Sequence, residues 1–141
     1  MNMINKPIVS FDFDGTLFYH KELQYFAQKL IGEGFEVCIT TRRSNDPKLD
    51  LSAAQWPHTE VEELAAELGI RTINYLHGQY KNTFFKDKEN YIHIDDDDVE
   101  LRMIGFDKMH GDNDVLCFST SEIKKFKDHI NEFSTQRPKE L

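Results

Sequence analysis

Acidic residues stand directly after two apolar runs of the sequence, at the places where buried strands would end. Asp12 and Asp14 close the run PIVSFDF and are followed at once by Gly15 and Thr16. The second run, NYIHIDDDD, ends in four aspartates at positions 95–98. Carboxylates held this close repel one another unless a cation or a shared proton compensates their charge. Mg²⁺ is a hard cation that takes oxygen ligands of this kind, so the acids predict a magnesium site.

The elements around these acids alternate between short β-rich runs and longer runs of helical periodicity, which is typical of an α/β fold. We expect strands over residues 7–13, 35–41, 70–78, 90–98 and 115–119, and helices over residues 21–34, 59–69, 81–89, 99–106 and 120–133. Strands joined through helices need crossover connections. The pattern therefore predicts a Rossmann-like three-layer sandwich, with a central five-stranded parallel sheet covered on both faces.

In a parallel sheet the carboxyl ends of the strands share one edge, and ligands bind in the crevice there. The first strand ends in Asp12 and Asp14, the second in Thr40, Thr41 and Arg42, and the fourth in the aspartates. Residues i and i+2 of a strand point to the same side, so Asp12 and Asp14 are expected to lean together. These three segments are expected to meet in one site.

The composition fits one soluble globular domain, over residues 1–133, followed by a loose tail at 134–141. No apolar run approaches the ~20 residues that span a bilayer, and the N-terminus lacks the pattern of a signal peptide, so a cytoplasmic protein without a membrane partner is expected. A net charge of −8 gives no general footprint for nucleic acid, which would need a local basic patch. Cys38 and Cys117 are expected to be buried, reduced thiols.

Three segments also resemble the motifs of a known family. SFDFDGTL resembles the first motif of the haloacid dehalogenase (HAD) superfamily of phosphohydrolases, an apolar strand followed by DxDGT. VCITTRR is similar to its second motif, an apolar strand ending in Thr or Ser, and YIHIDDDD to its fourth, which ends in paired acids. The similarity spans residues 8–98 in the family's order. Only residues 17–20 separate the first motif from the next helix, so the resemblance implies an HAD-like domain without a large cap.

The resemblance implies a role for each acid. Asp12 would be the nucleophile that forms an aspartyl-phosphate, and Asp14 the general acid and base. The ligands of Mg²⁺ would be Asp12, the main-chain carbonyl of Asp14, and Asp95 or Asp96. Thr40 would donate a hydrogen bond to a phosphoryl oxygen, and Thr41 and Arg42 are candidates for substrate binding, although Arg42 is as readily explained by pairing with neighbouring acids.

The lysine of the family's third motif has three candidates, because Lys81, Lys86 and Lys88 all precede the fourth strand. The helix after the third strand begins at the active edge and runs away from it, so its first residue lies closest to the site. Lys86 is five residues further, which is ~7.5 Å along a helix. We therefore choose Lys81, with Lys86 as the reserve.

Together these features predict a magnesium-dependent phosphomonoester hydrolase, because the second aspartate supplies the proton that an alkoxide leaving group needs. The phosphorylated substrate would be a small molecule or a nucleic-acid end, with a mild preference for a nucleotide or polynucleotide phosphate based on Trp56 and the pair Arg42 and Arg43. A site without a cap implies a bulky substrate, or a lid made by residues 42–60 or by a partner subunit of a homo-oligomer.

Two alternatives remain from other functional classes. A receiver domain also combines a five-stranded parallel sheet, Mg²⁺, acids, a Thr and a Lys, but it carries its phosphoacceptor after the third strand, where this sequence has no Asp. A catalytically silent HAD-like module that binds Mg²⁺ is the second alternative. The intact Asp12, Asp14 and Asp95 count against it.

Overall fold

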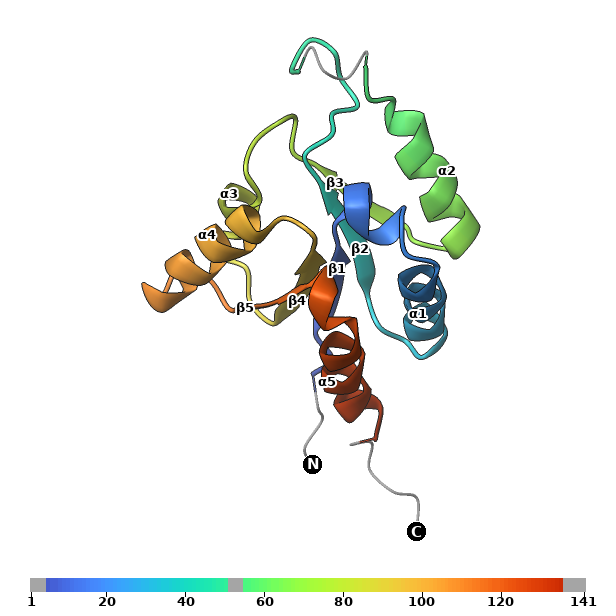
Figure 1. Ribbon diagram of the computed structural model, residues 1–141, viewed down its shortest axis with the longest axis vertical. Helices are drawn as coiled ribbons and strands as arrows, with labels where there is room; N and C mark the ends of the chain where they lie inside the picture. Colours follow the sequence, from blue (N-terminus) through green and yellow to red (C-terminus); the bar gives the residue numbers. More distant parts are fainter. Residues whose placement is uncertain (1–4, 51–54, 136–141) are drawn as a thin grey trace.

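Five parallel strands form a single sheet in the order β3-β2-β1-β4-β5 (Figure 1). The structure is a computed structural model that describes residues 5–50 and 55–135. The strands are β1 (Ile8–Phe11), β2 (Val37–Thr41), β3 (Thr72–Tyr75), β4 (Tyr91–Asp95) and β5 (Val115–Ser119). The α/β fold with a five-stranded parallel sheet, predicted from the sequence, is confirmed.

Helices cover both faces of the sheet, as the handedness of the crossovers requires. The chain moves outward from β1 through β2 to β3, then returns to β4 and moves the other way to β5, so right-handed connections place the two sets of helices on opposite faces. One face carries α1 (Lys21–Gly32), α2 (His58–Leu68) and α5 (Ile123–Thr135), and the other carries α3 (Lys81–Phe85) and α4 (Asp98–Met109). Two single turns, η1 (Phe13–Leu17) and η3 (Thr120–Glu122), complete the elements.

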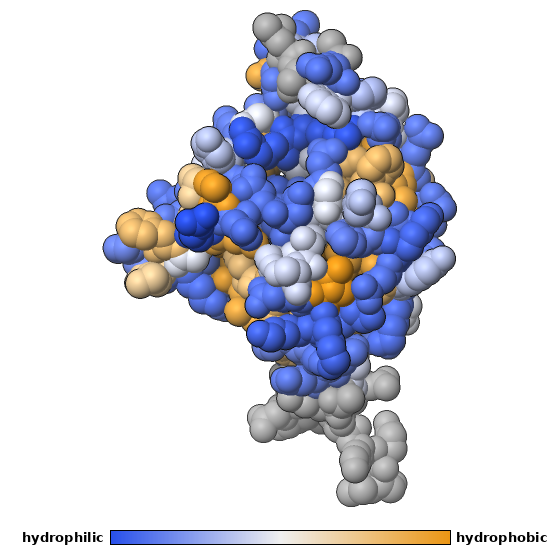
Figure 2. All heavy atoms as spheres, viewed as in Figure 1, coloured by the Kyte–Doolittle hydropathy of each residue, from blue (hydrophilic) through white to orange (hydrophobic). Residues whose placement is uncertain are grey.

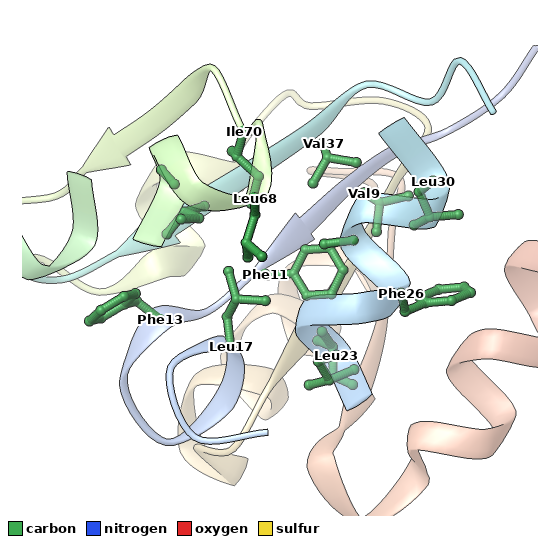
Figure 3. Packing of buried hydrophobic residues seen from close by; sticks show 14 of the residues in the cluster. Val9, Phe11, Phe13, Leu17, Leu23, Phe26, Leu30, Val37, Leu68 and Ile70 are labelled. Atoms are coloured by element: carbon green, nitrogen blue, oxygen red, sulfur yellow. The ribbon is translucent and has the colours of Figure 1, made fainter. Parts of the chain in front are cut away.

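The larger core lies between the sheet and α1, α2 and α5. Val9 and Phe11 alternate with Ser10 along β1, so their side chains point to the α1 face while the Ser10 side chain points to the face of α3 and α4. Figure 3 shows Phe11 among side chains from α1, including Leu23 and Phe26. The smaller core on the other face centres on Phe85, Ile104 and Val115. That second face has room for polar side chains beside its apolar cluster.

Several element boundaries differ from the prediction. The first and fourth strands end at Phe11 and Asp95, before the last acids of their runs. Helix α4 begins at Asp98, since the Asp97 side chain accepts hydrogen bonds from the backbone N–H groups of Val99 and Glu100. Helix α3 ends at Phe85 instead of residue 89. The tail expected at 134–141 lies largely on residues 136–141, outside the described residues.

The surface shown in Figure 2 is largely hydrophilic, with hydrophobic residues gathered in a few places that include the region of α4. On α4, Phe106 is 62% exposed and Met109 is 84% exposed. No helix within the described part of the chain is long and apolar enough to span a bilayer.

The packing of α5 on the sheet generates a stability prediction. Phe126 is fully buried, with its ring centroid 5.6 Å from Phe11 and 5.7 Å from both Phe26 and Phe118. Phe126→Ala would leave a cavity and is expected to lower the free energy of unfolding by about 3–5 kcal/mol. The exposed Phe106 is the matched control, and Phe106→Ala is expected to cost about 0.5 kcal/mol or less. Urea unfolding followed by circular dichroism measures both, and equal losses would contradict the described packing.

Candidate metal and catalytic site

A pocket of about 750 Å³ opens at the carboxyl edge of the sheet. The turns after β1, β2 and β4 and the first residues of α3 and α4 line it, which brings together distant parts of the sequence. The strand order reverses between β1 and β4, and such a reversal is where ligands bind in open α/β sheets. Of the candidate residues chosen from the sequence, the pocket is lined by Asp12, Asp14, Thr41, Arg42, Lys81, Asp95 and Asp96.

Three carboxylates meet at the floor of this pocket. Asp12, Asp95 and Asp96 each offer one oxygen, and these oxygens all lie within 4.8 Å of one another. Asp12 and Asp95 are buried, whereas Asp96 is exposed. Gly15 has a φ of +73°, and a Cβ atom at this position would collide with the Asp96 carboxylate. A glycine is therefore needed both for the turn and for the close approach of Asp96.

Lys81 joins the two buried acids. It is the first residue of α3, and its Nζ lies 2.7 Å from Asp12 Oδ1 and 2.7 Å from Asp95 Oδ2. Glu100 Oε2 lies 3.8 Å from the same nitrogen, and the Glu100 carboxylate also accepts the backbone N–H of Lys81. Lys86 is exposed and Lys88 Nζ lies over the Phe84 ring, so neither takes this place.

Burial and charge act in opposite directions on the pKa values of this group. Burial alone lowers the pKa of Lys81, but the charges of Asp12 and Asp95 outweigh it and hold that pKa above its ordinary value. Burial raises the pKa of Asp12 well above its usual range; Lys81 acts against this rise, while Asp95 and Asp96 add to it. Burial also acts to raise the pKa of Asp95, yet the hydrogen bonds and charges of His93 and Lys81 keep it below its ordinary value. A cation beside Asp12 would favour its ionised form.

Asp14 lines the same pocket but does not belong to this group of three carboxylates. Its carboxylate accepts two hydrogen bonds from Arg43, at 3.0 Å from Nε and 2.7 Å from Nη2, in a bidentate pair. Asp12 and Asp14 both line the pocket, while Phe11 and Phe13 both pack into the core cluster on the other side, so the alternation continues past the end of β1. Asp14 has a φ of −69° and a ψ of 127° within η1, and Gly15 then reverses the chain.

Arg43 also ties the segment after β2 to α2 and to the turn after β1. Its Nη1 donates to Glu60 Oε1 at 2.7 Å and to the carbonyl of Pro57 at 2.8 Å. The guanidinium carbon lies 4.9 Å from the Phe13 ring centroid and 5.8 Å from that of Trp56. From the sequence, Arg43 is only one half of a basic pair, whereas its buried position and its four acceptor contacts are seen only in the structure.

The two threonines at the end of β2 have different surroundings. The Thr40 side chain is fully buried, and its Oγ1 lies 2.8 Å from Ser10 Oγ and 3.2 Å from Asn74 Nδ2. Thr41 lines the pocket, and its Oγ1 accepts the backbone N–H of Arg43 at 3.1 Å. Neighbouring residues of a strand point to opposite faces, so both hydroxyls could not reach one ligand. The structure brings Thr41 to the pocket, and not Thr40.

Arg42 lies at the rim of the pocket with part of its guanidinium occupied. Nε and Nη2 donate to the carbonyl of Gly78 at 3.1 and 2.7 Å, and the group stacks 4.5 Å from the Tyr80 ring centroid. His93 of β4 is a further residue of the site. Its Nε2 lies 2.9 Å from Asp95 Oδ2, a contact suggested by their i, i+2 spacing on one strand.

The arrangement combines the parts that phosphoryl chemistry needs. Asp12 is fixed through both of its oxygens, because Oδ1 accepts from Lys81 and Oδ2 accepts from Thr16 Oγ1 at 2.9 Å. Three carboxylates around one opening form an all-oxygen donor set, which fits Mg²⁺ better than a softer metal. Lys81 is a hydrogen-bond donor to Asp12, and Thr41 lines the same pocket.

The buried position of Lys81 generates a prediction that separates it from Lys86. Lys81→Met leaves Asp12 and Asp95 buried without their shared cation, so the free energy of unfolding is expected to fall by about 3–5 kcal/mol. Lys86→Met is the control, because Lys86 is exposed, and its expected loss is about 0.5 kcal/mol or less. Urea unfolding at neutral pH without added metal measures both losses. A Lys81→Met protein as stable as the wild type would contradict this account of the buried pair.

Comparisons of the chain with models of protein families, with curated protein sequences and with solved structures found no match. The case for a function consequently comes from the residues themselves and from the geometry of the pocket.

Proposed function

We propose that the protein is a magnesium-dependent phosphomonoester hydrolase of the HAD type, in which Asp12 is the nucleophile. One observation carries the proposal: the Asp12 carboxylate lies at the floor of a pocket, held by Lys81 and Thr16, with carboxylate oxygens of Asp95 and Asp96 within 4.8 Å. A simple cluster of surface acids would not need the buried ammonium group of Lys81. It would also not need a glycine at position 15, where a Cβ atom would collide with the Asp96 carboxylate.

Asp96 is the best candidate for a direct ligand of the ion, because both oxygens of Asp12 accept hydrogen bonds from Lys81 and Thr16 and those of Asp95 are also occupied. Both oxygens of Asp95 already accept hydrogen bonds, Oδ2 from Lys81 and Oδ1 from the backbone N–H of Asp97 at 3.1 Å. Asp96, in contrast, is exposed at the pocket. When bound, Mg²⁺ would cancel the negative charge that otherwise repels a phosphate from these acids.

The chain's own groups would then carry out a two-step displacement. Asp12 attacks phosphorus, the bond from phosphorus to the leaving oxygen breaks, and Asp14 gives that oxygen its proton. A water molecule then attacks the aspartyl-phosphate, Asp14 takes its proton, and phosphate leaves. Lys81 and Thr41 donate hydrogen bonds to the phosphoryl oxygens. Because Asp14 is paired with Arg43, this pair has to open when substrate binds, and the Arg43 fork fits a phosphate as well as a carboxylate.

The charges around the pocket favour a small substrate with one phosphate group. Trp56 and Arg42 at the rim are compatible with a nucleotide. A polynucleotide, however, needs several cationic groups along its backbone, whereas the cationic residues that line the pocket are Arg42, Arg43 and the buried Lys81. Acidic side chains at 50, 97 and 98 line the same opening. A mononucleotide or another small phosphomonoester fits this surface better than a nucleic-acid end.

The central test is the loss of activity in Asp12→Asn. We expect Mg²⁺-dependent phosphate release from p-nitrophenyl phosphate in the wild type, and none above background in Asp12→Asn, because an amide cannot replace the nucleophilic carboxylate. EDTA is expected to abolish the activity, and added Mg²⁺ to restore it. Asp87→Asn is the matched control, since Asp87 is exposed and its φ of +65° is one that Asn readily adopts. Turnover by Asp12→Asn equal to that of Asp87→Asn would sink the proposal.

A second test concerns the hydroxyl group at the end of β2. Thr41→Val removes a donor to the phosphoryl group without a large change in volume, so kcat is expected to fall about 100-fold. Thr41→Ser keeps the hydroxyl and is expected to keep most of the activity. Steady-state kinetics on p-nitrophenyl phosphate separates the two variants. If Thr41→Val matched the wild type in kcat, Thr41 would have no part in phosphoryl binding.

A further inference from the structure

We propose that His93 is a positioning residue, which fixes the Asp95 carboxylate through a buried chain of hydrogen bonds that crosses four strands. The inference rests on the proposed function in one respect, namely that Asp95 belongs to a group of acids that holds a cation. The hydrogen bonds themselves do not depend on any substrate.

The chain of hydrogen bonds begins at Asn74 on β3 and ends at Asp95 on β4. Asn74 Nδ2 donates to Thr40 Oγ1 at 3.2 Å, and Thr40 Oγ1 lies 2.8 Å from Ser10 Oγ. Ser10 Oγ lies 2.9 Å from His93 Nδ1, and His93 Nε2 lies 2.9 Å from Asp95 Oδ2. The register of the sheet produces this alignment, because Ser10 of β1 is paired with His93 of β4.

The two ends of the chain and the neutral imidazole of His93 set its direction. The Asn74 amide nitrogen can only donate, and the Asp95 carboxylate can only accept. Burial lowers the pKa of His93, which favours the neutral imidazole. In a neutral imidazole whose Nε2–H donates to Asp95, Nδ1 accepts from Ser10; Ser10 then accepts from Thr40, and Thr40 accepts from Asn74. The proton of the imidazole then resides on Nε2 and points at Asp95 Oδ2. A second hydrogen bond fixes the tautomer of a histidine in the same way beside many metal sites.

The burial of these hydrogen-bonded side chains indicates that they serve the site more than the stability of the fold. Ser10, Thr40, His93 and Asp95 are all 0% exposed. Polar groups in a core cost free energy unless all are paired, and apolar side chains would fill the same space more simply. The chain also runs directly into Asp95. Because Ser10 is sealed inside the sheet, the Ser10, His93 and Asp95 set cannot act as a nucleophilic triad on a substrate.

The Asp95 carboxylate consequently accepts hydrogen bonds from three donors. Oδ2 accepts from His93 Nε2 and from Lys81 Nζ, and Oδ1 accepts from the backbone N–H of Asp97. Lys81 in turn contacts Asp12. Loss of the His93 contact would free Asp95 to rotate and would disturb the spacing between Asp12, Asp95 and Asp96 on which cation binding depends.

The first experiment determines the tautomer of His93 in the metal-free wild-type protein by long-range ¹H–¹⁵N NMR. We expect the Nε2–H form, with Nδ1 unprotonated, at neutral pH. A Nδ1–H form would overturn the direction of the chain and with it the proposal.

The second experiment measures the affinity for Mg²⁺ by isothermal titration calorimetry. His93→Leu removes the contact with Asp95 and is expected to raise the Kd by about 10- to 100-fold. His93→Gln can still place an amide N–H near the position of Nε2, and it is expected to bind Mg²⁺ almost as tightly as the wild type. Equal affinities of His93→Leu and the wild type would overturn the proposal, as would equal losses in the Leu and Gln variants.

Two further arms keep the result interpretable. If His93→Leu does not fold, Ser10→Ala replaces it, because this change removes the contact of His93 Nδ1 while keeping the imidazole. A weaker Mg²⁺ affinity of Ser10→Ala supports the positioning role of His93, and an unchanged affinity overturns it. Phosphate release is measured separately. A protein that binds Mg²⁺ in a His93-dependent way but hydrolyses no phosphomonoester would overturn only the proposed function. A wild-type protein without affinity for Mg²⁺ would overturn both.

Discussion

Two carboxylates share one buried ammonium group at the edge of the sheet, and the rest of the site is arranged around this contact. Asp12 and Asp95 are buried, and Lys81 Nζ lies 2.7 Å from each. Charges taken out of water cost several kcal/mol each unless they are paired and hydrogen-bonded. Lys81 supplies one positive charge among four neighbouring acids, namely Asp12, Asp95, Asp96 and Glu100, so a divalent cation would neutralise negative charge that Lys81 leaves unbalanced. The same unbalanced charge makes the pocket a poor site for a phosphate without that cation.

The fold provides this contact through its connectivity. Strands β1 and β4 are neighbours in the sheet although they lie about 80 residues apart in the sequence. Helix α3 belongs to the connection from β3 to β4, and Lys81 is its first residue. Glu100, at the start of α4, accepts the first N–H of α3 and so connects the two helices of that face. The side chains at the pocket floor are thus supported by rigid elements, which is what catalysis through pre-positioned groups requires.

Arg43 provides a second connection, between the site and the segment that follows β2. It pairs with Asp14, with Glu60 at the start of α2 and with the carbonyl of Pro57, while its plane lies near Trp56. Asp14, the proposed acid of the reaction, is therefore connected to Pro57 and Glu60 by one side chain.

The sequence by itself determined the fold class, because alternation of short β-rich and longer helical runs leaves few arrangements other than a parallel sheet between helices. It also determined which strand ends carry acids, and the rise per residue of a helix was enough to favour Lys81 over Lys86. Only the tertiary structure decided that Asp14 faces Arg43, that Thr41 rather than Thr40 reaches the pocket, and that His93 joins Ser10 to Asp95. The physical reason is that periodicity tells which residues of one strand share a face, whereas partners on other strands depend on register and on where each strand stops. Those are properties of the assembled sheet.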